Sequence, residues 1–125
     1  MLPRDFYLFP EDLYRIGNTT ESRLGHIRKM DINTTDVNGV VSVIANNKGV
    51  SVWDEANIRK GSLSGWAWKI PMNTELPPGL KLRNDSAGHY MICPVNQMPL
   101  DEYRGLLAKL AVRCQKAFQV AKREA

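Results

Sequence analysis

The chain has 125 residues, a formal net charge of +4, 43% hydrophobic residues and 24% charged residues. This mixture is that of an ordinary globular protein, and it excludes collagen-like, coiled-coil and disordered chains. The length suffices to bury a core without disulfides or metal, and we expect one domain over residues 1–125. No run of about 18 apolar residues occurs and Asp5 closely follows Met1, so we expect neither a transmembrane helix nor a secretory signal peptide.

The two cysteines, Cys93 and Cys114, lie in different segments, and the sequence contains no CxxC pair and no His/Cys cluster. Structural zinc sites need such spacings, so we predict no metal site. We interpret both cysteines as buried free thiols, because an unpaired cysteine packs like a small hydrophobic residue.

The first half of the chain predicts short strands. Residues 13–17 form a β-prone run that ends at a Gly-Asn turn pair. Residues 18–38 are polar and weakly patterned, and they fit either a short helix or a long loop with one or two helical turns. Residues 40–45 and 50–53 read as two strands joined by a turn, which predicts a β-hairpin.

The second half predicts further strands and a terminal helix. Asp54 suits the cap of a helix that ends by Gly61. Three runs closed by proline or turn residues predict strands, at 66–70, 80–83 and 89–94. From Pro99 onwards, apolar residues recur every three or four positions, which predicts a long C-terminal amphipathic helix. These apolar positions are Tyr103, Leu106, Leu107, Leu110, Cys114, Ala117, Phe118 and Ala121.

Several short strands with a terminal helix, and no regular βαβ alternation, favour an α+β fold with a mixed or antiparallel sheet. The sequence lacks the GxGxxG, P-loop, GxSxG and HExxH motifs. Rossmann-type nucleotide binding, NTPase, serine hydrolase and zinc protease functions therefore have no support from motifs.

Four polar residues on separate predicted strands and turns form the most suggestive set for chemistry, and they are Arg15, Ser51, Asp85 and His89. An arginine can bind a diphosphate through two parallel hydrogen bonds, and a serine can orient a ribose hydroxyl or an acid. Each residue also has a purely structural alternative. Arg15 fits a surface ion pair, Ser51 a polar strand position, Asp85 a turn, and His89 a structural hydrogen bond.

Two aromatic residues, Trp53 and Tyr90, lie on the same predicted strands as Ser51 and His89. Alternation places Ser51 and Trp53 on one face of their strand. Either aromatic ring could stack on a nicotinamide ring, and a core position is the alternative for Trp53.

Four segments then occur in a telling order, namely LYR at 13–15, GVSVWD at 49–54, LPPGLKLRNDS at 76–86 and HYMICP at 89–94. A Met-Pro step and a basic terminal segment follow them. In this order they resemble the small cytotoxic effectors that the type VI secretion system delivers between bacteria, a family with an ADP-ribosyltransferase-like fold. The resemblance covers residues 12–18 and about 49–122, and it leaves out 19–48.

The resemblance implies a single α+β domain with a split mixed or antiparallel sheet and an NAD-binding cleft. It implies an antibacterial toxin that uses NAD as substrate in the cytoplasm of the target cell, and that either transfers ADP-ribose to an acceptor or cleaves NAD. It also implies secretion without a cleaved leader, a cognate immunity protein that covers the cleft, and a secretion-system carrier protein.

The resemblance implies that Arg15 binds the NAD phosphates and that Ser51 positions the nicotinamide ribose. It also implies that Trp53 or Tyr90 stacks on the nicotinamide ring. The Thr-Ser step that the family needs for toxicity aligns with Val50-Ser51. Only the serine keeps its hydroxyl here, so the role of a hydroxyl at the preceding position does not carry over.

Related ADP-ribosyltransferases of the arginine class also use a glutamate on a later strand, which stabilises the positive charge on the ribose as nicotinamide leaves. No ExE pattern at a strand start is present in this sequence. Asp85 or His89 is therefore the candidate to stabilise that charge or to activate the acceptor.

Two other functions stay open on the sequence. Residues 101–125 carry six basic and three acidic residues, and the basic ones fall mainly opposite the apolar stripe of the predicted helix. This charge favours a basic toxin that targets RNA or another nucleic acid. The missing glutamate favours a non-enzymatic interaction module with a vestigial NAD cleft.

Overall fold

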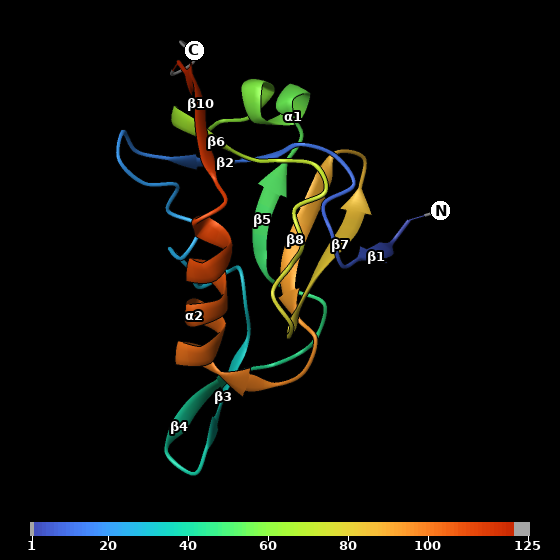
Figure 1. Cartoon of the computed structure of the whole chain (residues 1–125). Coiled ribbons are helices and arrows are strands. Elements are labelled where there is room, and N and C mark those ends of the chain that lie inside the picture. The colour runs from blue at the N-terminus through green and yellow to red at the C-terminus, as the bar shows by residue number, and fades with distance from the viewer. Residues whose placement is uncertain (1, 122–125) are drawn as a thin grey trace.

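The computed structural model describes residues 2–121, which form a mixed α+β fold (Figure 1). A seven-stranded sheet has the strand order β1-β7-β8-β5-β2-β6-β10, and a three-stranded sheet has the order β3-β4-β9. Every pairing between these strands is antiparallel. The elements are β1 (Arg4–Phe6), β2 (Leu13–Gly17), β3 (Thr34–Val37), β4 (Val40–Val43), β5 (Val50–Trp53), α1 (Glu55–Lys60), β6 (Gly65–Ile70), β7 (Leu80–Ser86), β8 (His89–Pro94), β9 (Met98–Pro99), α2 (Leu100–Ala111) and β10 (Gln115–Val120).

The predicted α+β class is confirmed, and the sheets are of the antiparallel kind. The strands predicted at 13–17, 66–70, 80–83 and 89–94 are present as β2, β6, β7 and β8. The helix capped by Asp54 is also present, because its carboxylate accepts the N–H of Asn57 at the start of α1.

Alternation along β5 and β8 gives the central sheet a core face and a second, partly exposed face. The two valines of β5 are fully buried, whereas Ser51 and Trp53 between and beside them are half-buried. On β8, Tyr90 is buried and His89 is half-buried. Trp53 lies opposite His89 in the β5–β8 register, so Ser51, Trp53 and His89 share the partly exposed face.

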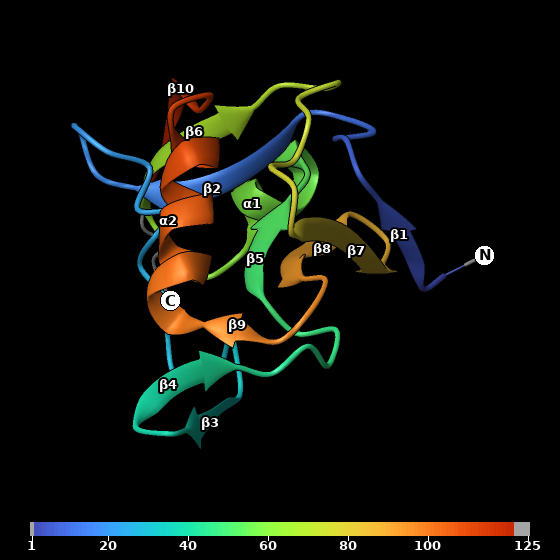
Figure 2. The same ribbon diagram turned by 60° about the horizontal axis from the view of Figure 1, so that its bottom comes forward.

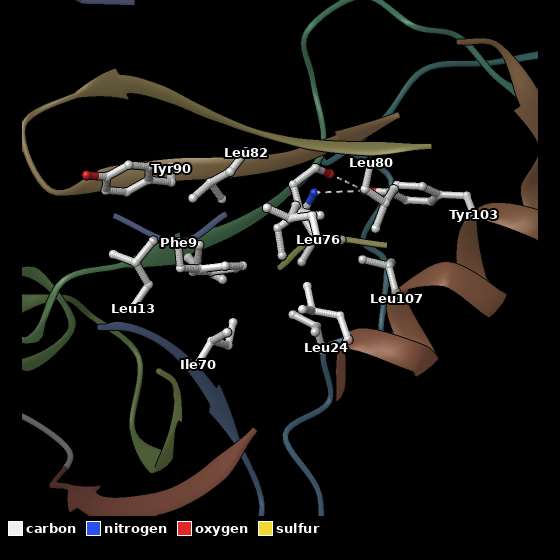
Figure 3. Packing of buried hydrophobic residues seen from close by; sticks show 14 of the residues in the cluster. Phe9, Leu13, Leu24, Ile70, Leu76, Leu80, Leu82, Tyr90, Tyr103 and Leu107 are labelled. Atoms are coloured by element: carbon white, nitrogen blue, oxygen red, sulfur yellow. Dashed lines mark hydrogen bonds between the residues drawn. The ribbon is translucent and has the colours of Figure 1, made fainter. Parts of the chain in front are cut away.

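The hydroxyl of Tyr103 links helix α2 to the core face of the sheet through hydrogen bonds. Tyr103, Leu107 and Leu110 are the buried residues of this helix. The Tyr103 hydroxyl donates to the carbonyl oxygen of Ile92 (2.6 Å) and accepts from the N–H of Val50 (3.2 Å), so it contacts both central strands (Figure 3). Burial raises the pKa of Tyr103, which keeps the hydroxyl protonated as a donor.

The predicted hairpin between residues 40–45 and 50–53 is wrong. β4 pairs with β3 and β9, whereas β5 pairs with β8 and β2 (Figure 2). The hairpin formed instead turns at Asn38-Gly39, whose φ angles of 52° and 84° are those that a type I′ turn requires. An Asn-Gly pair is typical of a hairpin turn, but this pair follows a polar segment whose residues show no clear strand pattern.

The predicted long C-terminal helix is wrong as well. α2 ends at Ala111, and β10 then pairs with β6. The apolar spacing continues past the end of the helix, but pairing with β6 satisfies the backbone and brings the Phe118 ring to 5.3 Å from the Tyr14 ring. The periodicity of apolar residues predicts a helix only weakly, because pairing with a distant strand can override it.

The basic residues of this region consequently do not share one helical face. Arg104 and Lys109 lie on α2, Arg113 follows it, and Lys116 lies on β10 over the ring of Trp66. The predictions for Lys122 and Arg123 fall outside the described residues. The nucleic-acid alternative thus loses the basic helix on which it was based.

Residues 18–33 form turns and irregular backbone, as the loop alternative for residues 18–38 predicted, and the helix carrying Leu24, Ile27 and Met30 is not formed. The rest of that segment was predicted wrongly, because residues 34–37 form strand β3. Leu24 is nevertheless buried in the main core. Cys93 is a buried free thiol, as predicted, and Cys114 is a half-buried one. Within residues 2–121, no helix has the length and apolar character needed to cross a membrane.

We expect Tyr103→Phe to lower the free energy of unfolding by roughly 1–3 kcal/mol, because the buried Ile92 carbonyl loses its donor while the ring still packs. Urea unfolding measures this change. Tyr7→Phe is the matched control, since Tyr7 is 63% exposed. Equal unfolding free energies for the two variants would show that the Tyr103 hydroxyl does not tie α2 to the sheet.

Candidate functional site

The seven-stranded sheet is nearly divided between β2 and β5. β2 pairs with β6 over five facing residues, and β5 pairs with β8 over four. Between β2 and β5 the register contains a single pair, Tyr14 with Trp53. Figures 1 and 2 both show β2 running across the end of β5 rather than alongside it. The seven strands therefore form one sheet that is narrowest at this junction beside Ser51, and we call the junction between β2 and β5 the split.

Arg15 bridges this split. Its side chain leaves β2, and Nη1 donates to the carbonyl oxygen of Ser51 on β5 (3.0 Å). Nη2 donates to the carbonyl oxygen of His26 (2.9 Å), which joins the loop before β3 to the same point. Arg15 is 6% exposed, and its Nε has no hydrogen-bond partner in the described part of the chain.

The charge on Arg15 has one carboxylate and two further guanidinium groups near it. Burial lowers the pKa of Arg15, the nearby carboxylate of Asp31 raises it, and the guanidinium groups of Arg28 and Arg23 lower it. Three cations thus lie close to one acid. Such an arrangement attracts an anion, because guanidinium groups bind carboxylates and phosphates through paired hydrogen bonds.

On the partly exposed face, Ser51, His89 and Asp85 form a hydrogen-bonded chain. Ser51 Oγ lies 3.0 Å from His89 Nε2, and His89 Nδ1 lies 2.7 Å from a carboxylate oxygen of Asp85. In the tautomer with the proton on Nδ1, Asp85 accepts that proton's hydrogen bond and Nε2 accepts from the Ser51 hydroxyl. The serine hydroxyl then has a base directly beside it.

A β-bulge aims Asp85 at this histidine. In the β7–β8 register Asn84 faces Tyr90 and Ser86 faces His89, so Asp85 is the extra residue. The buried side-chain amide of Asn84 donates to the carbonyl oxygens of Ser86 (2.7 Å) and His89 (2.9 Å). Asn84 therefore holds the bulge, a role that no sequence motif indicated.

The turn before His89 is also fixed, by the start of α1. Gly88 has a φ of 75°, and a Cβ on it would collide with the side chains of Asp54 and Asn57. The Asp54 N–H donates to the Gly88 carbonyl oxygen (2.9 Å), and the Asn57 amide donates to that of Ala87 (3.2 Å). The cap of α1 and the turn thus support each other beside the histidine.

Trp53 packs beside the histidine of the Ser51–His89–Asp85 chain and also lines two adjoining hollows, neither of which is lined by the three residues of that chain. Its ring centroid lies 5.5 Å from that of His89. One hollow, of about 300 Å³, extends towards Asn57 and Ser62, and the other, of about 220 Å³, extends towards Arg15. Trp53, Arg28 and Leu63 line both hollows, so they form one recess with an aromatic wall and several cations.

Tyr90 does not belong to this recess. It is 5% exposed on the core face, where its hydroxyl donates to Glu11 (2.7 Å) and its ring lies 6.3 Å from that of Phe6. Figure 3 shows it among the core residues. The suggestion that Tyr90 stacks on a ligand is therefore corrected, because residue 90 alternates with His89 and points to the opposite side of the sheet.

Of the residues proposed from the sequence, Arg15, Ser51, Trp53, Asp85 and His89 lie together. Sequence reasoning missed Arg23, His26 and Arg28, which lie in the irregular segment before β3 and belong to no motif. Only the three-dimensional course of that loop brings them to the split.

A family model described as Tse2 ADP-ribosyltransferase toxin matches residues 11–118. The match contains all the residues of the split and of the Ser51–His89–Asp85 chain, and it also spans the segment 19–48 that the four resembling segments left out. No curated protein matches the chain significantly.

We expect Arg15→Lys to lower the free energy of unfolding by about 2–3 kcal/mol. A single ammonium lacks the fork that reaches two carbonyl oxygens, so one buried acceptor loses its donor. Guanidinium chloride unfolding measures the loss. Arg113→Lys is the matched control at an exposed position. Unchanged stability of Arg15→Lys would contradict the bridging role.

Proposed function

Because the chain belongs to the Tse2 ADP-ribosyltransferase toxin family, we propose that it is an antibacterial toxin that binds NAD at the split between β2 and β5. The reaction is the transfer of ADP-ribose from NAD to an acceptor, with water as the acceptor in the hydrolytic version. The observation that carries the proposal is the convergence of Arg15, Ser51, His89 and Asp85 at one place in the sheet.

The recess beside Trp53 suits the chemical parts of NAD. An indole ring can stack on a flat heterocycle, and the cations of the recess suit the diphosphate. Asn57 and Ser62 add polar groups that can bind ribose hydroxyls. The residues present therefore fit the substrate that the family name implies.

The reaction breaks the bond between nicotinamide and the ribose carbon, and nicotinamide leaves with the electron pair. Positive charge develops on the ribose, and an acceptor then forms a bond to the same carbon and gives up a proton. A negatively charged group near that carbon lowers the barrier. In this proposal Ser51 positions the nicotinamide ribose. His89 accepts the proton of the acceptor or of the Ser51 hydroxyl.

Asp85 is the carboxylate best placed to support this charge. Asp54 caps α1, where it accepts the N–H and the side-chain amide of Asn57 (2.9 Å and 2.8 Å), and Glu55 pairs with Arg59 (2.9 Å). Asp85 acts through His89, which it contacts directly. In this proposal the Asp85–His89 pair takes the place of the glutamate that the arginine class uses.

The toxin would act in the cytoplasm of a target bacterium. We propose delivery by a type VI secretion system on a carrier protein, and neutralisation by a cognate immunity protein that covers the split. The support for these statements is the resemblance of the four sequence segments to that class of effectors.

The first test uses Ser51→Ala and His89→Ala. We expect each to reduce the rate of NAD consumption by the purified protein by about a hundredfold or more and to abolish growth arrest after induction in bacteria. Ser51→Ala keeps the carbonyl that accepts from Arg15, so we expect its circular dichroism and unfolding curve to match those of the wild type.

The matched control is Thr35→Val, which removes a hydroxyl from the exposed strand β3 and should leave toxicity and NAD consumption intact. A folded Ser51→Ala protein that still arrests growth and consumes NAD at the wild-type rate would refute the assignment of the site.

A further inference from the structure

The cations at the split differ in what they can offer a ligand. Both terminal nitrogens of Arg15 already donate to carbonyl oxygens, and the residue is 6% exposed. Its geometry suits the bridge between β2 and β5, and it leaves little of the guanidinium free for a soluble anion. The charge needed for a diphosphate must then come from other side chains.

Arg28 has the opposite character. Its side chain is 40% exposed and lies in both hollows of the recess, next to Trp53. Asp31, whose side chain is 3% exposed, accepts from the Arg28 backbone N–H (2.8 Å) and from Nη2 (3.3 Å), so it fixes the arginine in place. Arg28 Nε is buried and has no hydrogen-bond partner among residues 2–121.

A buried and unpaired guanidinium nitrogen is costly, because its hydrogen-bonding capacity is lost on folding without replacement. Because Nε itself is buried, a ligand oxygen reaches Arg28 at the exposed part of its guanidinium group, where arginine can bind phosphate through paired hydrogen bonds. Asp31 contacts the guanidinium at Nη2, and the exposed part of the Arg28 side chain faces the recess, where it can bind an anion.

Arg23 supplies a second cation at the same recess. It is exposed, it lines the hollow that contains Arg15, and it has a φ of 58°, a conformation that non-glycine residues adopt at a cost. A turn in which its carbonyl oxygen accepts the His26 N–H (3.0 Å) holds it there. The loop thus adopts an unfavourable backbone conformation at Arg23, a residue that lines the recess.

We propose that Arg28, assisted by Arg23, binds the diphosphate of the dinucleotide, and that Arg15 is a positioning residue that holds Ser51. This inference rests on the proposed function and names the groups that recognise its substrate. The diphosphate lies at Arg28, where the two hollows meet, the nicotinamide side extends along Trp53 towards His89, and the adenosine side extends towards Asn57 and Ser62.

Isothermal titration of the full chain with inorganic pyrophosphate, and separately with NAD, tests this assignment. We expect Arg28→Gln to weaken both by about tenfold or more, and Arg23→Gln to weaken both by a smaller factor. Arg113→Gln removes the same charge from an exposed position outside the recess and should change neither. Circular dichroism and urea unfolding check each variant, and Arg23→Gln keeps the test open if Arg28→Gln unfolds.

The outcomes separate this inference from the proposed function. Unchanged binding of NAD and pyrophosphate to folded Arg28→Gln would overturn the role of Arg28 and leave the NAD-dependent function standing. Pyrophosphate binding that depends on Arg28, without any NAD binding, would support the anion site and overturn the NAD-dependent function. A wild-type chain that binds neither probe would overturn both.

Discussion

The separation of β2 from β5 is the constraint on which the site depends. Strands that part leave backbone carbonyl groups without ladder partners, and buried groups of this kind must be satisfied by other donors. Arg15 supplies the donor for Ser51 and, through His26, ties the neighbouring loop to the same point. A buried cation is expensive, and two carbonyl oxygens and the nearby carboxylate of Asp31 offset that cost. The Arg15 side chain thus spans the split and donates hydrogen bonds to one carbonyl oxygen of β5 and to one of the neighbouring loop.

Ser51 is the residue at which the scaffold and the chemistry meet. Its carbonyl oxygen accepts from Arg15 across the split, while its hydroxyl contacts His89 on the partly exposed face. The same alternation that buries the valines of β5 turns this hydroxyl towards the histidine. Its surroundings are equally fixed, because the bulge held by Asn84 aims Asp85 at His89. The geometry therefore comes from strands and their irregularities, which position side chains more rigidly than free loops do.

The sequence could predict what depends on local pattern. Five strands of the seven-stranded sheet (β2, β5, β6, β7 and β8), the cap of α1 and the common face of Ser51 and Trp53 follow from alternation and turn chemistry, whereas β1 was not predicted. Pairing partners do not, so β5 was joined to the wrong strand and β10 was taken for helix. Tyr90 was misplaced because the side of a strand that faces the site is known only once the sheet is assembled. Asn84 and Arg28 gave no local signal, since each acts through contacts made by the folded chain.

The irregular backbone of residues 18–33 allows contacts with the split that a helix in this segment would prevent. A helix there would use the His26 carbonyl oxygen for its own hydrogen bonds, whereas the loop presents it to Arg15. A helix would also exclude the positive φ that places Arg23 beside the recess. Helical order in this segment would therefore remove both the clamp on Arg15 and the second cation at the recess. The irregular loop instead places Arg23 and Arg28 at the recess next to Arg15, and it pairs Arg28 with the buried carboxylate of Asp31.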